Sequence, residues 1–79
     1  MSPTIFREGP FRFYIFSREE TRIYVHVQAP NGEAKFWLQP CIELATNHGM
    51  SMREINAAHG LIEEHAHEIR KAWKKHFGS

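Results

Sequence analysis

The last third of the chain, SMREINAAHGLIEEHAHEIRKAWKKHF at residues 51–77, carries the strongest periodic pattern in the sequence. Its apolar residues recur at steps of three or four, which places them along one stripe of an α-helix. Ser51 and Glu54 have the spacing of a capping box, and Gly78 follows as a stop signal. The stretch therefore predicts one long helix. Its apolar stripe comprises Met52, Ile55, Ala58, Ile62, Ala66, Ile69, Trp73 and Phe77.

One glycine, Gly60, lies inside this predicted helix. A glycine in a helix interior costs about 1 kcal/mol relative to alanine. A close approach of the helix to the sheet and a slight bend would each account for it, and the sequence leaves both open.

The residues before the helix alternate apolar and polar side chains, which is the pattern of half-buried β-strands. The alternating runs are 11–17, 22–29 and 33–39, joined by a charged loop at 18–21 and a Pro-Asn-Gly turn at 30–32. Residues 5–7 look extended. Residues 41–46 favour an edge strand, with a short helix as the alternative.

Connections this short imply that neighbouring strands run antiparallel as a meander. The sequence thus predicts a single α+β domain over residues 1–79. We expect a three- to four-stranded antiparallel meander sheet with one long C-terminal helix packed on one face.

One face of the predicted sheet is wholly apolar and matches the helix stripe as a partner. Burial of each large side chain on this face contributes roughly 1.5–3 kcal/mol before entropy is counted. The set is Phe11, Phe13, Ile15, Ile23, Val25, Val27, Ala34, Phe36, Leu38, Ile42 and Leu44.

The opposite face mixes aromatic and cationic side chains, although no second helix is predicted to cover it. Tyrosine, tryptophan and arginine are enriched at binding hot spots, so this face is a candidate interface. The alternative is that the aromatic residues only stabilise the sheet through cross-strand pairs. The candidate binding residues are Arg12, Tyr14, Phe16, Tyr24, His26, Lys35 and Trp37.

Composition narrows the function classes. A formal net charge of +1 gives no strong overall field for nucleic acid, and a single cysteine, Cys41, rules out an internal disulfide framework. No apolar run approaches the roughly 20 residues of a membrane span. We therefore expect a soluble, cytoplasmic protein without membrane contact.

Six histidines raise the question of a metal site. His59, Glu63 and His67 share a helical spacing, and so do Glu64 and His67. A zinc site needs three or four convergent ligands, however, and one helix does not supply them. We predict a solvated helix face, no native metal and no cofactor.

The sequence signal for a catalytic site is similarly weak. Cys41 and His48 could suggest a thiol nucleophile, but no third orienting group and no oxyanion-hole motif accompany them. A small semi-buried residue after Pro40 is the favoured interpretation of Cys41. We predict no catalytic residues, and a hydrolase or nuclease ranks lowest.

Several segments together resemble the family labelled domain of unknown function 4160, small bacterial proteins without an established activity. The resemblance covers nearly the whole chain. The residues that match the family's pattern are Pro3 to Gly9, Phe11-Arg12-Phe13, Gly32 to Leu38 with Pro40, Leu44-Ala45, Asn47, Gly49, Glu54-Ile55, Trp73 and His76 to Gly78.

The second strand departs from that family's pattern. The family usually carries a Pro-Pro-His-x-His-Val segment there, whereas this chain has Arg22-Ile23-Tyr24-Val25-His26-Val27. His26 is retained, but Tyr24 replaces the first histidine, so a two-histidine role would lack one of its members. The resemblance implies a toxin–antitoxin-like gene context and supplies no catalytic residues.

We conclude from the sequence that a non-enzymatic protein-interaction module is the leading hypothesis. It would be a toxin–antitoxin-like component or an inhibitor of a bacterial or phage protein, and the aromatic face or an edge strand would contact the partner. That partner would be another protein or a second copy of the chain. The alternative is a single-stranded nucleic-acid-binding protein, because stacking rings beside cations also suit that ligand.

Overall fold

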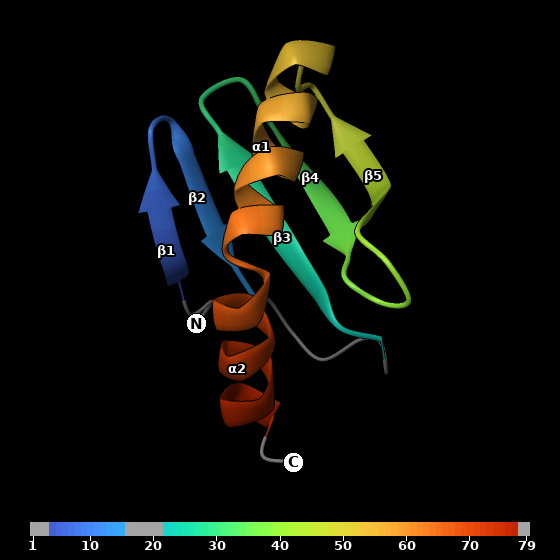
Figure 1. Ribbon diagram of the computed structural model, residues 1–79. Coiled ribbons are helices and arrows are strands. Elements are labelled where there is room, and N and C mark those ends of the chain that lie inside the picture. Colours follow the sequence, from blue (N-terminus) through green and yellow to red (C-terminus); the bar gives the residue numbers. More distant parts are fainter. Residues whose placement is uncertain (1–3, 16–21, 78–79) are drawn as a thin grey trace.

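A computed structural model describes residues 4–15 and 22–77, and these residues form five strands followed by two helices (Figure 1). Each strand pairs antiparallel with the next one in the chain, so the sheet order is β1-β2-β3-β4-β5. The predicted α+β class and antiparallel meander are confirmed. The elements are β1 (Thr4–Glu8), β2 (Phe11–Tyr14), β3 (Tyr24–Ala29), β4 (Gly32–Trp37), β5 (Glu43–His48), α1 (Met52–Glu64) and α2 (Ala66–Phe77).

The prediction of three to four strands is wrong because it does not count β1. Glu8 pairs with Phe11 across a two-residue turn, in which Gly9 has a φ of 59° and Pro10 supplies a fixed φ. On the helix side, the ring of Phe6 stacks on that of Phe13 with centroids 4.3 Å apart. This contact attaches β1 to the core.

The edge strand predicted after Pro40 is confirmed, and its helical alternative is wrong. The strand, β5, is displaced toward the C-terminus relative to the prediction, since it begins at Glu43 and includes Asn47 and His48. An irregularity lies opposite Lys35 and Phe36, where the register with β4 shifts. The shift leaves Ala45 of β5 without a cross-strand partner on β4.

The prediction of a single long helix is also wrong, because the helical stretch is interrupted at His65 (Figure 1). His65 has a φ of −109° and a ψ of 16°, outside the helical region. The break leaves the apolar periodicity intact, since the backbone N–H of His65 still donates to Leu61 and that of Ile69 to His65. The capping box at the start of α1 is confirmed. The Ser51 hydroxyl accepts from the Glu54 N–H, and the Glu54 carboxylate accepts from the Ser51 N–H.

The core lies between the apolar sheet face and the helix stripe, as predicted. Among the described side chains, four depart from that prediction: Leu44 is 41% exposed, Met52 is 71% exposed, and Ile42 and Ala66 are half-buried. Met50, just before α1, is buried instead. The buried predicted residues are Phe11, Phe13, Ile15, Ile23, Val25, Val27, Ala34, Phe36, Leu38, Ile55, Ala58, Ile62, Ile69 and Trp73.

Candidate functional site: the outer face of the sheet

The sheet face opposite α1, here called the outer face, brings together most of the predicted site residues. Tyr14, His26 and Lys35 are successive cross-strand partners on β2, β3 and β4, so their side chains form one row. Cross-strand partners of an antiparallel pair point to the same face. All three are half-buried, as are Arg12 and Trp37 beside them.

Aromatic stacking and hydrogen bonds hold one end of this row. The ring of Tyr14 stacks on that of His26, with centroids 5.2 Å apart and an interplanar angle of 19°. The guanidinium of Arg12 lies 4.5 Å from the Tyr14 ring centroid and donates to Thr4 Oγ1 at 2.8 Å and Gln28 Oε1 at 3.2 Å. These contacts fix the guanidinium between β1 and β3.

Trp37 organises the other end of the outer face. The guanidinium of Arg22 lies 4.2 Å from its ring centroid, and the ammonium of Lys35 lies 4.6 Å from it. Arg22 is held in place because it donates to the backbone carbonyl of Gln39 at 2.6 and 3.2 Å. A half-buried indole with two neighbouring cations therefore forms a cation–π cluster at the surface.

Tyr24 is where the predicted surface is wrong, because its side chain is fully buried. Its ring meets Trp73 of α2 edge-on at 4.8 Å, while His26 and Lys35 of the outer face lie 5.3 and 4.7 Å from its centroid. Tyr24 is the first residue of β3, and α2 lies at that end of the sheet (Figure 1). The strand periodicity did not reveal this cover, which comes from a helix distant in the sequence.

The outer face carries more cations than carboxylates. Arg12, Arg22 and Lys35 lie on it, and Arg7 joins them because it is the cross-strand partner of Arg12. Burial raises the pKa of the Tyr14 hydroxyl, the nearby Glu33 carboxylate raises it further, and Arg12 lowers it. The Tyr14 hydroxyl therefore stays protonated at neutral pH and can donate a hydrogen bond.

The remaining predicted groups do not assemble into a reactive centre. Phe16 lies outside the described residues. In residues 4–15 and 22–77, no three or more His, Cys, Asp or Glu side chains converge as metal ligands. His59 and Glu63 form an i, i+4 pair at 3.7 Å, as expected for a solvated helix face. Cys41 is exposed rather than semi-buried.

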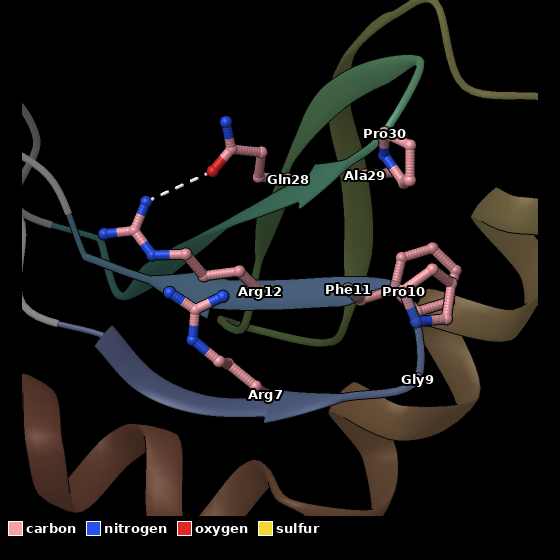
Figure 2. A pocket seen from close by; sticks show the side chains of 8 residues that line it. All are labelled: Arg7, Gly9, Pro10, Phe11, Arg12, Gln28, Ala29 and Pro30. Atoms are coloured by element: carbon pink, nitrogen blue, oxygen red, sulfur yellow. Dashed lines mark hydrogen bonds between the residues drawn. The ribbon is translucent and has the colours of Figure 1, made fainter.

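Two cationic hollows escaped the sequence analysis. The first, of about 230 Å³, lies beside Arg7 and Arg12 at the β1–β2 turn (Figure 2). Recognition of β1 as a paired strand would have placed the two arginines side by side. The second, of about 470 Å³, lies where α2 meets the sheet. Its lining is Ile23, Gln39, His67, Arg70, Lys71 and Lys74, and the spacing of its four α2 residues is the signal that marks one helical face.

The family model described as a domain of unknown function (DUF4160) matches residues 11–74. The chain belongs to the DUF4160 family. The DUF4160 match begins at the first residue of β2 and extends into α2, so it includes Arg12, Tyr14, Lys35 and Trp37 of the outer face and leaves out β1. The resemblance found in the sequence is confirmed. No curated protein and no solved structure matches this DUF4160 chain.

None of the helices in the described part of the chain is both long enough and apolar enough to cross a membrane.

Proposed function

We propose that the chain is a non-enzymatic protein-interaction module and that its outer face binds the partner. The supporting observation is that α1 and α2 bury the opposite face, whereas the rings of Tyr14 and Trp37 stay partly exposed among cations on this one. An antiparallel sheet with one solvated face normally makes that face polar. Rings held by neighbouring cations are pre-ordered for binding, which lowers the entropy cost of association.

The charge of the outer face favours a different, acidic protein over a second copy of the chain. In a two-fold dimer the same patch faces itself, so Arg12, Arg22 and Lys35 of one copy would meet those of the other. Like charges brought together at an interface oppose association by several kcal/mol. A partner surface with carboxylates around an apolar centre would complement both the cations and the rings.

The finer proposal is that this partner belongs to a toxin–antitoxin-like pair in a bacterial cytoplasm, or is a bacterial or phage protein that the chain inhibits. It rests on the family resemblance alone. Co-expression with the captured partner tests it, because a functional pair should show growth arrest by one member and relief by the other. Unchanged growth in every combination would remove this proposal.

The partner itself is tested by quantitative capture from a lysate of the native host, followed by calorimetry on the purified complex. The test variant is Tyr14→Ala with Trp37→Ala, and the control is Met52→Ala, which removes a 71% exposed apolar side chain outside the outer face. We expect the double variant to bind at least about 30-fold more weakly, the loss of a hot spot, and the control to bind normally. Equal affinity of all three proteins would overturn the assignment.

Single-stranded nucleic acid is the second candidate, and a specific juxtaposition favours it. Trp37, with its two cations, offers a ring on which a base could stack. Gln39 connects this ring to the α2 hollow, since its carbonyl accepts from Arg22 and the residue lines the hollow. Within the described residues, Lys71 and Lys74 make no hydrogen bond or ion pair. They could therefore contact phosphates without losing other partners.

Salt dependence tests this candidate. If Arg70, Lys71 and Lys74 each neutralise one phosphate of an oligothymidylate, the slope of log K against log salt should be about −2. The double variant Lys71→Ala with Lys74→Ala should bring the slope below about 1 in magnitude. Quenching of tryptophan fluorescence reports binding, and Trp37→Phe separates its signal from that of buried Trp73. Absence of quenching at low salt would eliminate this function.

A further inference from the structure

Strand β5 forms one edge of the sheet, and among the described residues only β4 pairs with it (Figure 1). Exposed sheet edges are usually protected by charged side chains or by proline, because their unpaired main-chain groups can bind another strand. The opposite edge, β1, contains Arg7 and Glu8, whereas residues 44–47 of β5 carry neither a charge nor a proline. Leu44 is also an exposed apolar side chain. The composition of β5 is therefore that of a strand suited to pairing with another chain.

The pairing of β3 with β4 determines which main-chain groups of the sheet face β5. The N–H of Leu38, the residue directly after β4, donates to the Ile23 carbonyl at 2.9 Å. Because main-chain groups alternate in direction along a strand, those of the even-numbered β4 residues face β3. Those of the odd-numbered β4 residues therefore face β5.

The same alternation identifies the open main-chain groups of β5 itself. The partners of the odd-numbered β4 residues are Glu43, Thr46 and His48, so the N–H and C=O groups of these three residues face β4. Leu44 follows Glu43, and Asn47 lies between Thr46 and His48. Their N–H and C=O groups are therefore directed to the open edge.

The spacing of Leu44 and Asn47 restricts which strand can pair with this edge. The outward-facing residues of a regular strand recur at every second position, but these two are three positions apart because Ala45 has no partner on β4. A regular strand cannot match both, whereas a second β5 that runs antiparallel presents the same interval. The Asn47 side chain fixes one end of the interval, since it donates to the Met50 carbonyl at 3.0 Å and accepts from the Met50 N–H at 3.1 Å. The main chain thus favours a second copy over an unrelated strand.

We propose that β5 pairs antiparallel with β5 of a second copy and joins two five-stranded sheets edge to edge. Leu44 of one copy lies opposite Asn47 of the other, and a two-fold axis passes between Ala45 and Thr46. Edge-to-edge pairing sets the two outer faces side by side rather than against each other, so their cations are not brought into contact. The proposal is independent of the protein partner proposed above, because the rings of the outer face take no part in it.

The charges at the two ends of β5 are complementary in this register, which places Glu43 opposite His48 of the second copy. Both side chains point to the outer face, as do their β4 partners Trp37 and Glu33. Glu43 and His48 make no hydrogen bond or ion pair with the described residues. The imidazole can donate to a carboxylate whether it is neutral or protonated. Parallel pairing would instead bring the two Glu43 side chains together, so charge also favours the antiparallel dimer.

The test is sedimentation of the full chain over a range of concentrations near pH 6, below the ordinary pKa of histidine. Glu43→Lys and His48→Glu each place like charges at both ends of the paired strands, so each variant alone should dimerise about tenfold more weakly. An equimolar mixture should recover the wild-type affinity, because the introduced lysine then faces the introduced glutamate. The control is Glu64→Lys, which makes the same charge change at the exposed end of α1 and should leave the affinity unchanged.

Amide hydrogen exchange locates the interface within the chain. Exchange at Leu44 and Asn47 should slow as the concentration of the wild-type chain rises, because pairing satisfies their outward N–H groups. A chain that stays monomeric up to about 1 mM would overturn the proposal. So would a dimer in which these two amides exchange at the monomer rate, or a mixture of the two charge variants that dimerises no more tightly than either variant alone.

Discussion

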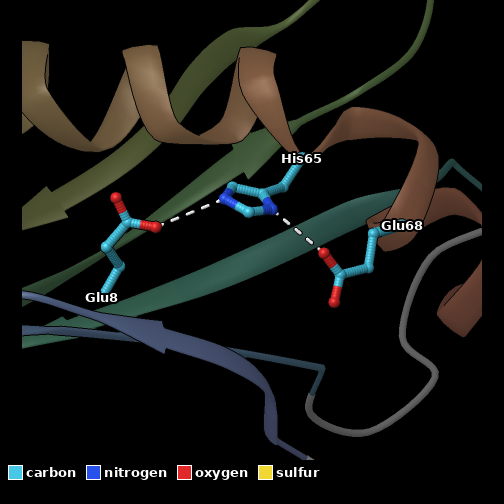
Figure 3. A network of polar contacts seen from close by, with 3 residues as sticks. All are labelled: Glu8, His65 and Glu68. Atoms are coloured by element: carbon cyan, nitrogen blue, oxygen red, sulfur yellow. Dashed lines mark hydrogen bonds and ion pairs between the residues drawn. The ribbon is translucent and has the colours of Figure 1, made fainter.

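His65 Nε2 lies 3.3 Å from Glu8 Oε1, which connects the break between the helices to the first strand over 57 positions of sequence. The other ring nitrogen, Nδ1, lies 3.0 Å from Glu68 Oε1 in the first turn of α2 (Figure 3). The imidazole also packs on the Phe6 ring with centroids 4.1 Å apart. One side chain thereby fixes β1, α1 and α2 relative to one another.

This junction predicts a pH dependence of stability. The hydrogen bond to Glu68 is the main cause that raises the pKa of His65 above 6.5. Burial opposes this rise in the pKa of His65, and the hydrogen bond to Glu8 adds to it. Because the pKa is higher in the folded state, the junction stabilises the fold fully below about pH 6.5. The contribution is lost as pH rises through the folded-state pKa. Urea unfolding over this range should show a loss in the wild type that is absent in His65→Gln.

His67→Gln is the matched control for that experiment, because His67 is an exposed histidine of the same helix. It should keep the pH dependence of the wild type. If His65→Gln and the wild type lose stability in parallel as the pH rises, the junction does not titrate as described.

Two glycines should respond in opposite directions to substitution by alanine. No heavy atom outside its own helix lies within 4 Å of a Cβ built at Gly60, so Gly60→Ala should raise the free energy of unfolding by about 1 kcal/mol. A Cβ on Gly32 would collide with the backbone of His48 and Gly49. Gly32→Ala should therefore destabilise the protein. Chemical denaturation measures both, and a destabilised Gly60→Ala would show that α1 needs a glycine.

The two large aromatic residues Tyr24 and Trp37 are cross-strand partners but should differ in their effect on stability. Tyr24 is fully buried, so Tyr24→Ala should cost about 3–5 kcal/mol, the range for truncation of a large buried aromatic side chain. Trp37 is half-buried on the outer face, so Trp37→Ala should cost less. Equal losses in urea unfolding would mean that the Trp37 ring is also part of the core. Tyr24→Ala is thus unsuited to tests of binding.

The start of α1 offers a test of the capping box. Ser51→Ala removes the side-chain oxygen that accepts from the Glu54 N–H at 3.2 Å, and it should cost about 1 kcal/mol. Ser51→Asp should retain most of the stability, because its carboxylate accepts the same bond and suits the positive end of the helix. Equal urea midpoints for Ser51→Asp and Ser51→Ala would contradict this prediction.

Sequence periodicity predicted those parts of the fold that a single side-chain repeat determines. The alternation in β2, β3 and β4 placed Phe13, Val25 and Phe36 in the core, and the helical stripe placed Ile62 there. The break at His65 was not predicted, because the hydrogen bonds on either side of it keep the four-residue spacing. Strand β1 escaped because its stability comes from tertiary contacts of Phe6 and Glu8.

The candidate site was predicted less completely, for a related reason. Strand parity assigned Arg12, Tyr14, His26, Lys35 and Trp37 to one face, which the register confirms. Parity also assigned Tyr24 to that exposed face. It did not show that α2 covers the Tyr24 end of the sheet, because the position of α2 depends on the turn at His65. Contacts between residues far apart in the sequence therefore account for both the missed element and the misplaced side chain.

The meander order of the sheet has a consequence for synthesis on the ribosome. Every strand pairs with its neighbour in the chain, so each hairpin closes a short loop and can form as soon as its second strand emerges. Both helices are translated after all five strands, and their buried residues, such as Ile62 and Ile69, are the ones that cover the apolar face. The nascent sheet thus exposes Phe13, Val25 and Phe36 until then, which makes this interval the one in which aggregation or chaperone binding competes with folding.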